Sequence, residues 1–127
     1  MNNNQTTHPL HQFAQKYYTL YTSPSTTEPE VEEHFADECF ALNFQMDCGE
    51  SIERIFRGRR VLYDVSSFAE VVGEIDDVYV LGSAIFSKYR DITHWSEYSG
   101  LLSRDNREWF KLAFRRLMEL AEEKETE

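Results

Sequence analysis

The stretch from Asp76 to Trp95 reads DDVYVLGSAIFSKYRDITHW, and its pattern guides the interpretation of the whole chain. Its apolar residues recur in steps of three and four, which places them on one face of a helix. Acids open the stretch, and Lys88 and Arg90 lie toward its end, an order that suits the helix dipole. The small residues Gly82-Ser83-Ala84 would let another backbone approach closely. We therefore predict a largely buried central helix of an all-helical domain.

Apolar periodicity on both sides of this stretch predicts further helices. The second of them should begin at a capping-box spacing, Thr27-x-x-Glu30. Val61-Leu62-Tyr63 is predicted as a short extended segment. The flanking helices are expected at about residues 9–21, 27–46, 50–56, 66–72 and 105–121.

The fold class that follows is all-α: a compact, single-domain bundle of five or six helices with little or no strand. A length of 127 residues suits one domain. We expect the helical domain to span residues 8–121. A disordered polar lead is predicted for residues 1–7 and a solvated charged tail for residues 122–127.

Charge narrows the classes of function. The chain carries 23 acidic and 13 basic residues, a formal net charge of −10. This balance disfavours direct binding to nucleic acid or to an anionic membrane, and it favours basic partners. The chain has two cysteines, Cys39 and Cys48, too few for a disulfide framework, and we recognise no signal peptide or apolar span of ~20 residues. We expect a cytoplasmic protein with reduced thiols.

An acidic block between Glu28 and Glu53 is the strongest candidate for a binding surface. It holds nine acidic residues and no Lys or Arg. Acids three or four apart on a helix repel each other mildly. Such repulsion is tolerated either because it keeps the protein soluble or because the acids bind a basic partner. The alternative is an ordinary solvated face. The residues predicted to bind a partner are Glu28, Glu30, Glu33, Asp37, Glu50 and Glu53.

Two groups of basic and aromatic residues are weaker candidates. The turn Arg57-Gly58-Arg59-Arg60 could bind an anion, and the exit of the central helix, at His94 and Trp95, could border a pocket. A basic stripe on the last helix could contact phosphates, but we favour pairing with Glu108, Glu119 and the acidic second helix. That stripe comprises Arg104, Arg107, Lys111 and Arg115.

Motifs for metal binding or catalysis are weak. The histidines and cysteines match neither the paired short spacings of a zinc site nor the His-Glu-x-x-His pattern. Asp91, His94 and Ser96 or Ser99 lie close in sequence, but a catalytic triad is defined by geometry. The simpler interpretation is that His94 ends the central helix and Trp95 packs on the core. We predict no metal, no cofactor and no assigned catalytic residue.

The function predicted from these features is a non-catalytic, acidic protein-binding module. Its most specific form is an inhibitor that covers a basic, nucleic-acid-binding surface of a target such as a CRISPR effector or another defence effector. That link is an analogy of charge and size. One alternative is a small helical enzyme or ligand-binding domain with a pocket near His94 and Trp95. The other is a homodimer anchored by exposed aromatic residues, with Tyr18, Phe40, Phe44 or Phe110 as the candidates.

Overall fold

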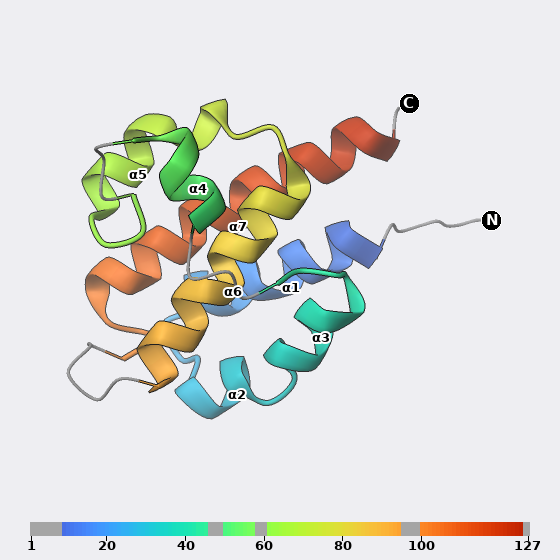
Figure 1. The fold of residues 1–127 in the computed structure, drawn as a ribbon. Helices are drawn as coiled ribbons and strands as arrows, with labels where there is room; N and C mark the ends of the chain where they lie inside the picture. Colours follow the sequence, from blue (N-terminus) through green and yellow to red (C-terminus); the bar gives the residue numbers. More distant parts are fainter. Residues whose placement is uncertain (1–8, 46–49, 58–60, 95–99, 126–127) are drawn as a thin grey trace.

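The computed structural model describes residues 9–45, 50–57, 61–94 and 100–125 (Figure 1). These residues form helices joined by short turns, with no strand among them, so the predicted all-α class is confirmed. Among the described helices, we find none whose length and hydropathy would suit a membrane span. In chain order, the elements are α1 (Pro9–Thr22), α2 (Glu28–Glu32), α3 (Phe35–Ala41), α4 (Glu50–Ile55), α5 (Val65–Val71), the 3₁₀ turn η2 (Val72–Glu74), α6 (Val78–His94) and α7 (Arg104–Glu125).

Helices α1 and α7 pack along each other in antiparallel directions (Figure 1). Near the end of α1, the ring of Tyr21 stacks on Phe110 with centroids 4.8 Å apart. Near its start, His11 Nε2 lies 3.2 Å from Glu122 Oε2. Helix α7 runs to Glu125, so it includes Glu122 and most of the predicted charged tail. The predicted polar lead, residues 1–7, lies outside the described residues. The buried residues of α1 are those expected from its periodicity: Leu10, Phe13, Ala14, Tyr17 and Tyr21.

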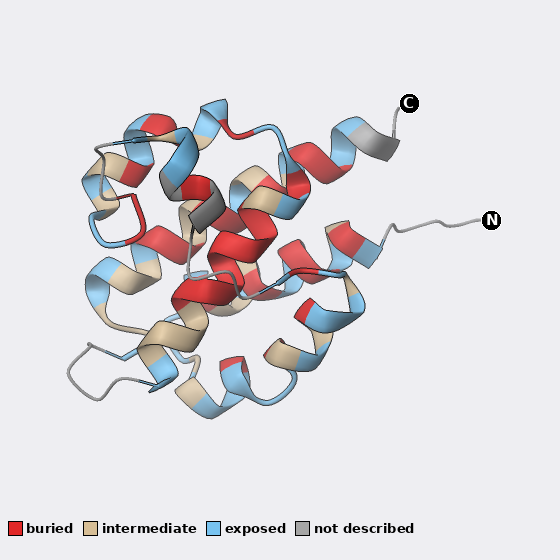
Figure 2. Ribbon diagram, in the orientation of Figure 1, coloured by how far each residue is buried: buried red, intermediate tan, exposed pale blue. Residues whose placement is uncertain are grey.

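Helix α6 lies at the centre of the fold, between the α2–α3 pair and the α4–α5 pair (Figure 1). Every residue from Leu81 to Lys88 is buried, so the middle of this helix is covered on all sides (Figure 2). A surface helix would expose one face over two turns. The prediction of a largely buried central helix is therefore confirmed.

The small residues of α6 accommodate the chain that follows α3. Asn43 adopts a positive φ of 66°, which ends the helical path and turns Phe44 inward. The ring of Phe44 lies directly against Gly82: a Cβ built there would come within 2.2 Å of ring carbon Cε1. One residue further on, the backbone N–H of Gln45 donates to Ser83 Oγ at 3.1 Å. The close approach predicted for this patch is thus made by a ring and by a backbone amide.

The single helix predicted for residues 27–46 is divided into α2 and α3, with a turn at Glu33-His34. The division places Asp37 and Glu38 in the first turn of α3, where the positive end of the helix dipole stabilises carboxylates. In an unbroken helix the same acids would lie mid-helix. Glu33 would then be four residues before Asp37, and the two carboxylates would repel each other with no cation between them. The expected capping box is present, because Glu30 Oε1 accepts the backbone N–H of Thr27 at 2.7 Å.

The extended segment predicted at Val61-Leu62-Tyr63 is instead a turn. Two buried donors hold its carbonyl groups in place. The indole Nε1 of Trp109 donates to Val61 O at 2.8 Å, and Lys88 Nζ donates to Leu62 O. Lys88 Nζ also lies 5.1 Å from the centroid of the Trp109 ring, so its charge is stabilised by the π face. Because these backbone groups bond to side chains, the segment needs no partner strand.

The apolar spacing of α4 predicts that Ile52, Ile55 and Phe56 face inward, and one of these three positions is wrong. Ile52 is buried as expected, and Phe56 is half-buried. Ile55, however, is 56% exposed. A helix of six residues has room for one buried face, and in α4 that face is centred on Ile52.

Replacing Gly82 by Ala should destabilise the fold. The added methyl group would overlap the Phe44 ring, and overpacking of this kind costs about 1–3 kcal/mol, more than the helix propensity of Ala returns. Urea unfolding measures the loss. Gly73→Ala is the matched control, because a Cβ at Gly73 meets nothing within 4 Å. Equal stabilities of the two variants would contradict the close contact, and Phe44→Leu should partly rescue Gly82→Ala.

The contribution of Lys88 to stability should increase with pH. Burial lowers the pKa of Lys88 to about 8, against an opposing effect of the Asp91 charge, whereas an unfolded lysine titrates near 10.4. The folded state therefore releases this proton first. We compare the free energies of unfolding of the parent protein and of Lys88→Met at each pH. The parent value minus the variant value should be roughly 2 kcal/mol larger at pH 10 than at pH 7. A constant difference in urea titrations at the two pH values would contradict it.

Candidate functional site

A groove follows the seam between α1 and the α2–α3 pair, and we call it the acidic groove. It consists of three hollows of about 490, 610 and 490 Å³: the second and third lie along α1, and the first is formed by residues 29–33 alone and adjoins the second. The first two share Glu30 and Glu33, and the last two share Gln12 and Lys16. The first is lined by Pro29, Glu30, Glu32 and Glu33; the second by Gln12, Gln15, Lys16, Thr19, Leu20, Glu30, Glu33 and His34; the third by Pro9, Gln12, Phe13, Lys16, Glu38, Ala41 and Leu42.

Two carboxylates of the groove already have structural partners. Glu30 Oε1 accepts both the backbone N–H of Thr27 at 2.7 Å and its hydroxyl at 3.0 Å, so Glu30 serves to start α2. Glu38 Oε1 accepts Lys16 Nζ at 2.9 Å and the hydroxyl of Tyr17. Burial, the hydrogen bond to Glu38 and its negative charge raise the pKa of Tyr17 well above its usual value. Glu38 therefore joins α3 to α1.

Three other acids of α2 and α3 are exposed and available to a partner: Glu32, Glu33 and Asp37. Glu33 Oε1 lies 3.9 Å from His34 Nε2, and this contact is an ion pair only when the imidazole is protonated. Within the described residues we find no ion pair to Glu32 or Asp37. Residue Glu32 belongs to the predicted acidic block but is absent from the six predicted binding residues.

The six predicted binding residues do not all lie together. Glu30 and Glu33 line the acidic groove, and Asp37 is exposed on neighbouring α3. Glu28 is half-buried, with its carboxylate against Gly100, where a Cβ would come within 2.1 Å of Oε2. The remaining two, Glu50 and Glu53, belong to α4, which packs on α6 apart from α2 and α3 (Figure 1), and their side chains lie outside the described part of the structure.

The second group of predicted site residues is described only in part. Arg57 is exposed beyond the end of α4, and the rest of its basic turn, with Arg59 and Arg60, falls outside the described residues. His94 is exposed at the end of α6 and lines none of the three hollows of the acidic groove. Trp95 also falls outside the described residues. The pocket proposed at these positions therefore stays a prediction.

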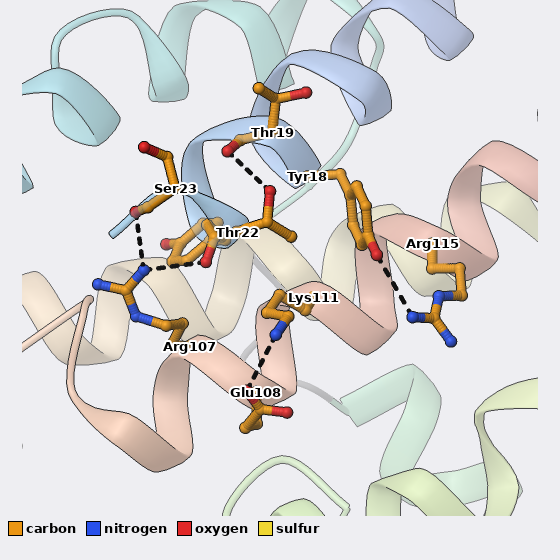
Figure 3. Close-up of polar contacts among 9 residues, drawn as sticks. Tyr18, Thr19, Thr22, Ser23, Arg107, Glu108, Lys111 and Arg115 are labelled. Carbon is orange, nitrogen blue, oxygen red and sulfur yellow. Dashed lines mark hydrogen bonds and ion pairs between the residues drawn. The ribbon is translucent and has the colours of Figure 1, made fainter. Parts of the chain in front are cut away.

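Three residues of the basic stripe on α7, Arg107, Lys111 and Arg115, contact other parts of the protein (Figure 3). Arg107 Nη1 donates to the carbonyl groups of Tyr21 at 3.0 Å and Ser23 at 3.2 Å, where α1 ends. Pairing of Lys111 with Glu108, at 3.1 Å, agrees with the favoured interpretation. The expected pairing with the acidic second helix is not what we find for Arg107, because the free carbonyl groups at the end of α1 accept its hydrogen bonds instead.

Other basic side chains of α7 are engaged in the same way. Arg115 lies over the ring of Tyr18, and its Nη2 donates to the Tyr18 hydroxyl at 3.3 Å (Figure 3). Arg116 Nε donates to Ile75 O at 2.9 Å, and its Nη1 pairs with Glu119 at 3.0 Å. These contacts help to fix α7 against its neighbours and leave the exposed acids of α2 and α3 without these cations.

The aromatic residues considered as dimer anchors occupy different environments. Phe44 and Phe110 are fully buried, so neither can anchor a second copy of the folded chain. Tyr18 is half-buried under Arg115. Phe40 is 56% exposed, with one edge against Phe86 at a centroid distance of 5.1 Å. Tyr79, which the sequence patterns did not single out, is 57% exposed.

Among the residues that the structure describes, we find no group of three or more His, Cys, Asp or Glu arranged to hold a metal ion. Cys39 is a free thiol buried in the core, and burial raises its pKa well above the usual value. A buried, protonated thiol of this kind acts as a small apolar side chain rather than as a nucleophile.

Comparisons of the chain with protein-family models, with curated proteins and with solved structures found no match. The site must therefore be interpreted from its own geometry and charge.

Two buried tyrosines of α1 should respond differently to loss of the hydroxyl. Tyr17→Phe removes the hydrogen bond to the Glu38 carboxylate and should cost about 1–3 kcal/mol of unfolding free energy. Tyr21→Phe is the matched control: we find no hydrogen-bond partner for its buried hydroxyl within the described structure. Its removal should leave stability unchanged or raise it by up to about 1 kcal/mol. Equal losses in urea unfolding would contradict this difference.

Proposed function

We propose that this protein is a non-catalytic binding module that docks its acidic groove onto a Lys- or Arg-rich segment of a partner protein. The observation that supports the proposal best is the concentration of exposed carboxylates beside a groove. Residues 28–41 contain six acidic residues and no Lys or Arg. Glu32, Glu33 and Asp37 remain exposed there, while many basic side chains of α7 are bound elsewhere in the protein.

The electrostatics of such a surface suit association. A net charge of −10 attracts a basic partner over a distance of about one Debye length, roughly 8–10 Å in physiological salt. Carboxylates that line a hollow then fix the position of the partner, because a cleft lined by one sign of charge concentrates the electric field and complementary charges set the register. Salt should therefore weaken binding mainly through the rate of association.

A narrower form of the proposal is inhibition. A basic surface that normally holds nucleic acid is one target that a small acidic protein could cover, and a CRISPR effector or another defence effector has such a surface. Charge and size are what this form rests on. We expect the encounter to take place in the cytoplasm, where Cys39 stays reduced.

Charge reversal on α2 and α3 should weaken binding to a labelled ten-lysine peptide. The test variant carries Glu32→Lys, Glu33→Lys and Asp37→Lys, and it spares Glu30 because that residue starts α2. We expect at least about a tenfold rise in Kd, measured by fluorescence anisotropy at low salt. Circular dichroism checks that the variant remains folded.

The matched control changes net charge equally but on other parts of the surface. It carries Glu74→Lys, Asp76→Lys and Asp105→Lys, three exposed acids outside α2 and α3. We expect its Kd to rise by less than about threefold. Equal weakening of both variants would mean that the peptide responds to net charge alone. That result, or unchanged binding of the α2–α3 variant, would overturn the proposed docking surface.

A further inference from the structure

The length and lining of the acidic groove indicate what kind of segment it would hold. We infer that it takes a short, extended peptide segment with Lys or Arg at one end and an apolar side chain at the other. This inference rests on the docking function proposed above and adds the form, length and side-chain order of the partner segment.

The length of the groove follows from the helix that forms one wall. Its lining on α1 runs from Pro9 in the third hollow to Leu20 in the second, a separation of 20 − 9 = 11 residues. At ~1.5 Å per residue, this wall is roughly 16 Å long. An extended chain advances about 3.3 Å per residue, so about five residues would span it. The first hollow, around Pro29, shares Glu30 and Glu33 with the second and so extends the groove on the α2 side.

The two ends of the groove differ in chemistry. The end formed by α2 has Glu30, Glu32 and Glu33 around Pro29. At the opposite end, the lining of the third hollow is largely apolar: Pro9, Phe13, Ala41 and Leu42. Carboxylates bind Lys or Arg, and an apolar lining gains free energy when it covers an apolar side chain. A segment that satisfies both ends must therefore separate its cationic and apolar side chains.

The middle of the groove disfavours a cation. Lys16 lines both the second and the third hollow, and its Nζ pairs with Glu38 Oε1 at 2.9 Å. Glu38 also accepts the Tyr17 hydroxyl, so its charge is already shared between two donors. A cationic side chain of the partner placed beside this ion pair would be repelled by Lys16, whereas nearer α2 it would meet the exposed carboxylate of Glu33. Cations thus belong at the α2 end rather than along the whole segment.

The wall of α1 suits the backbone of an extended segment. Gln15 and Thr19 are exposed on it and line the second hollow. The amide of Gln15 can both donate and accept hydrogen bonds, and so can the hydroxyl of Thr19. Backbone N–H and C=O groups of a segment lying along α1 would find these partners whatever its side chains are. The preference for side-chain order therefore comes from the two ends.

Three labelled heptapeptides test the order of side chains. Two have a pair of arginines at one terminus, a pair of leucines at the other and three serines between, in the two possible directions. The third has the same composition with both arginines in the centre. The better of the first two should bind at least about tenfold more tightly than the third, by fluorescence anisotropy.

A substitution at the apolar end tests the place of binding. Ala41 is exposed, and Ala41→Gln would fill that end of the groove with a polar side chain without changing charge. It should raise the Kd of the better heptapeptide by about tenfold and leave the Kd of the ten-lysine peptide unchanged. Ala69→Gln is the matched control, because Ala69 is exposed on α5, away from the groove, and it should change neither Kd.

The outcomes separate this inference from the docking function. Equal affinities for the three heptapeptides, or no effect of Ala41→Gln, would overturn the inference. The docking function would survive that result if reversal of Glu32, Glu33 and Asp37 still weakened the ten-lysine peptide more than the control reversal did. Loss of that difference would overturn both.

Discussion

Packing of the aromatic rings of α1 against those of α7 is the contact on which the rest of the fold depends. Tyr17 stacks with Phe114 and Tyr21 with Phe110, with centroids 5.7 and 4.8 Å apart. Rings of this size bury a large apolar area each, and their offset arrangement adds further stability. The apolar face of α1 packs on α7 and on Phe35 of α3, so its polar edge is left at the surface beside α2 and α3. The acidic groove exists at that edge, so the same contact that holds the core together also positions the candidate binding surface.

The protein places several of its cations on carbonyl oxygens rather than on carboxylates. Arg107 binds the carbonyl groups at the end of α1, Arg116 binds that of Ile75 and buried Lys88 binds that of Leu62. Each of these bonds closes a turn or a helix end whose carbonyl group would otherwise need water or another donor. Arg116 also pairs with Glu119, but within the described residues we find no ion pair between these three cations and the acids of α2 and α3. The negative charge of α2 and α3 is thus a result of how the fold uses its basic residues, as well as of composition.

Periodicity predicted the features that depend on local sequence. The central helix, the buried face of α1 and the cap at Glu30 follow from spacing within a few residues, and the structure confirms them. The turn at 61–63 was not predicted, because it depends on the distant donors Trp109 and Lys88. The division between α2 and α3 was missed because the apolar spacing of Val31, Phe35 and Cys39 continues across it. The candidate site was found in part. The acidic residues could be recognised from the sequence. The groove could not, because it forms where α1, α2 and α3 pack together, and spacing along one helix does not predict that packing.

The pairing of α1 with α7 also affects how fast the protein folds. Tyr21 and Phe110 are 110 − 21 = 89 residues apart, and His11 and Glu122 are 122 − 11 = 111 apart. Closing loops of this length costs entropy before the contact returns any free energy, and folding rates fall as contacts become less local. During synthesis, α1 leaves the ribosome long before α7 exists, so the ring faces that Tyr17 and Tyr21 turn to α7 stay uncovered until then. The order in which the helices are made therefore leaves the fold incomplete until the last one arrives, and exposes the nascent chain to association through α1 in the interval.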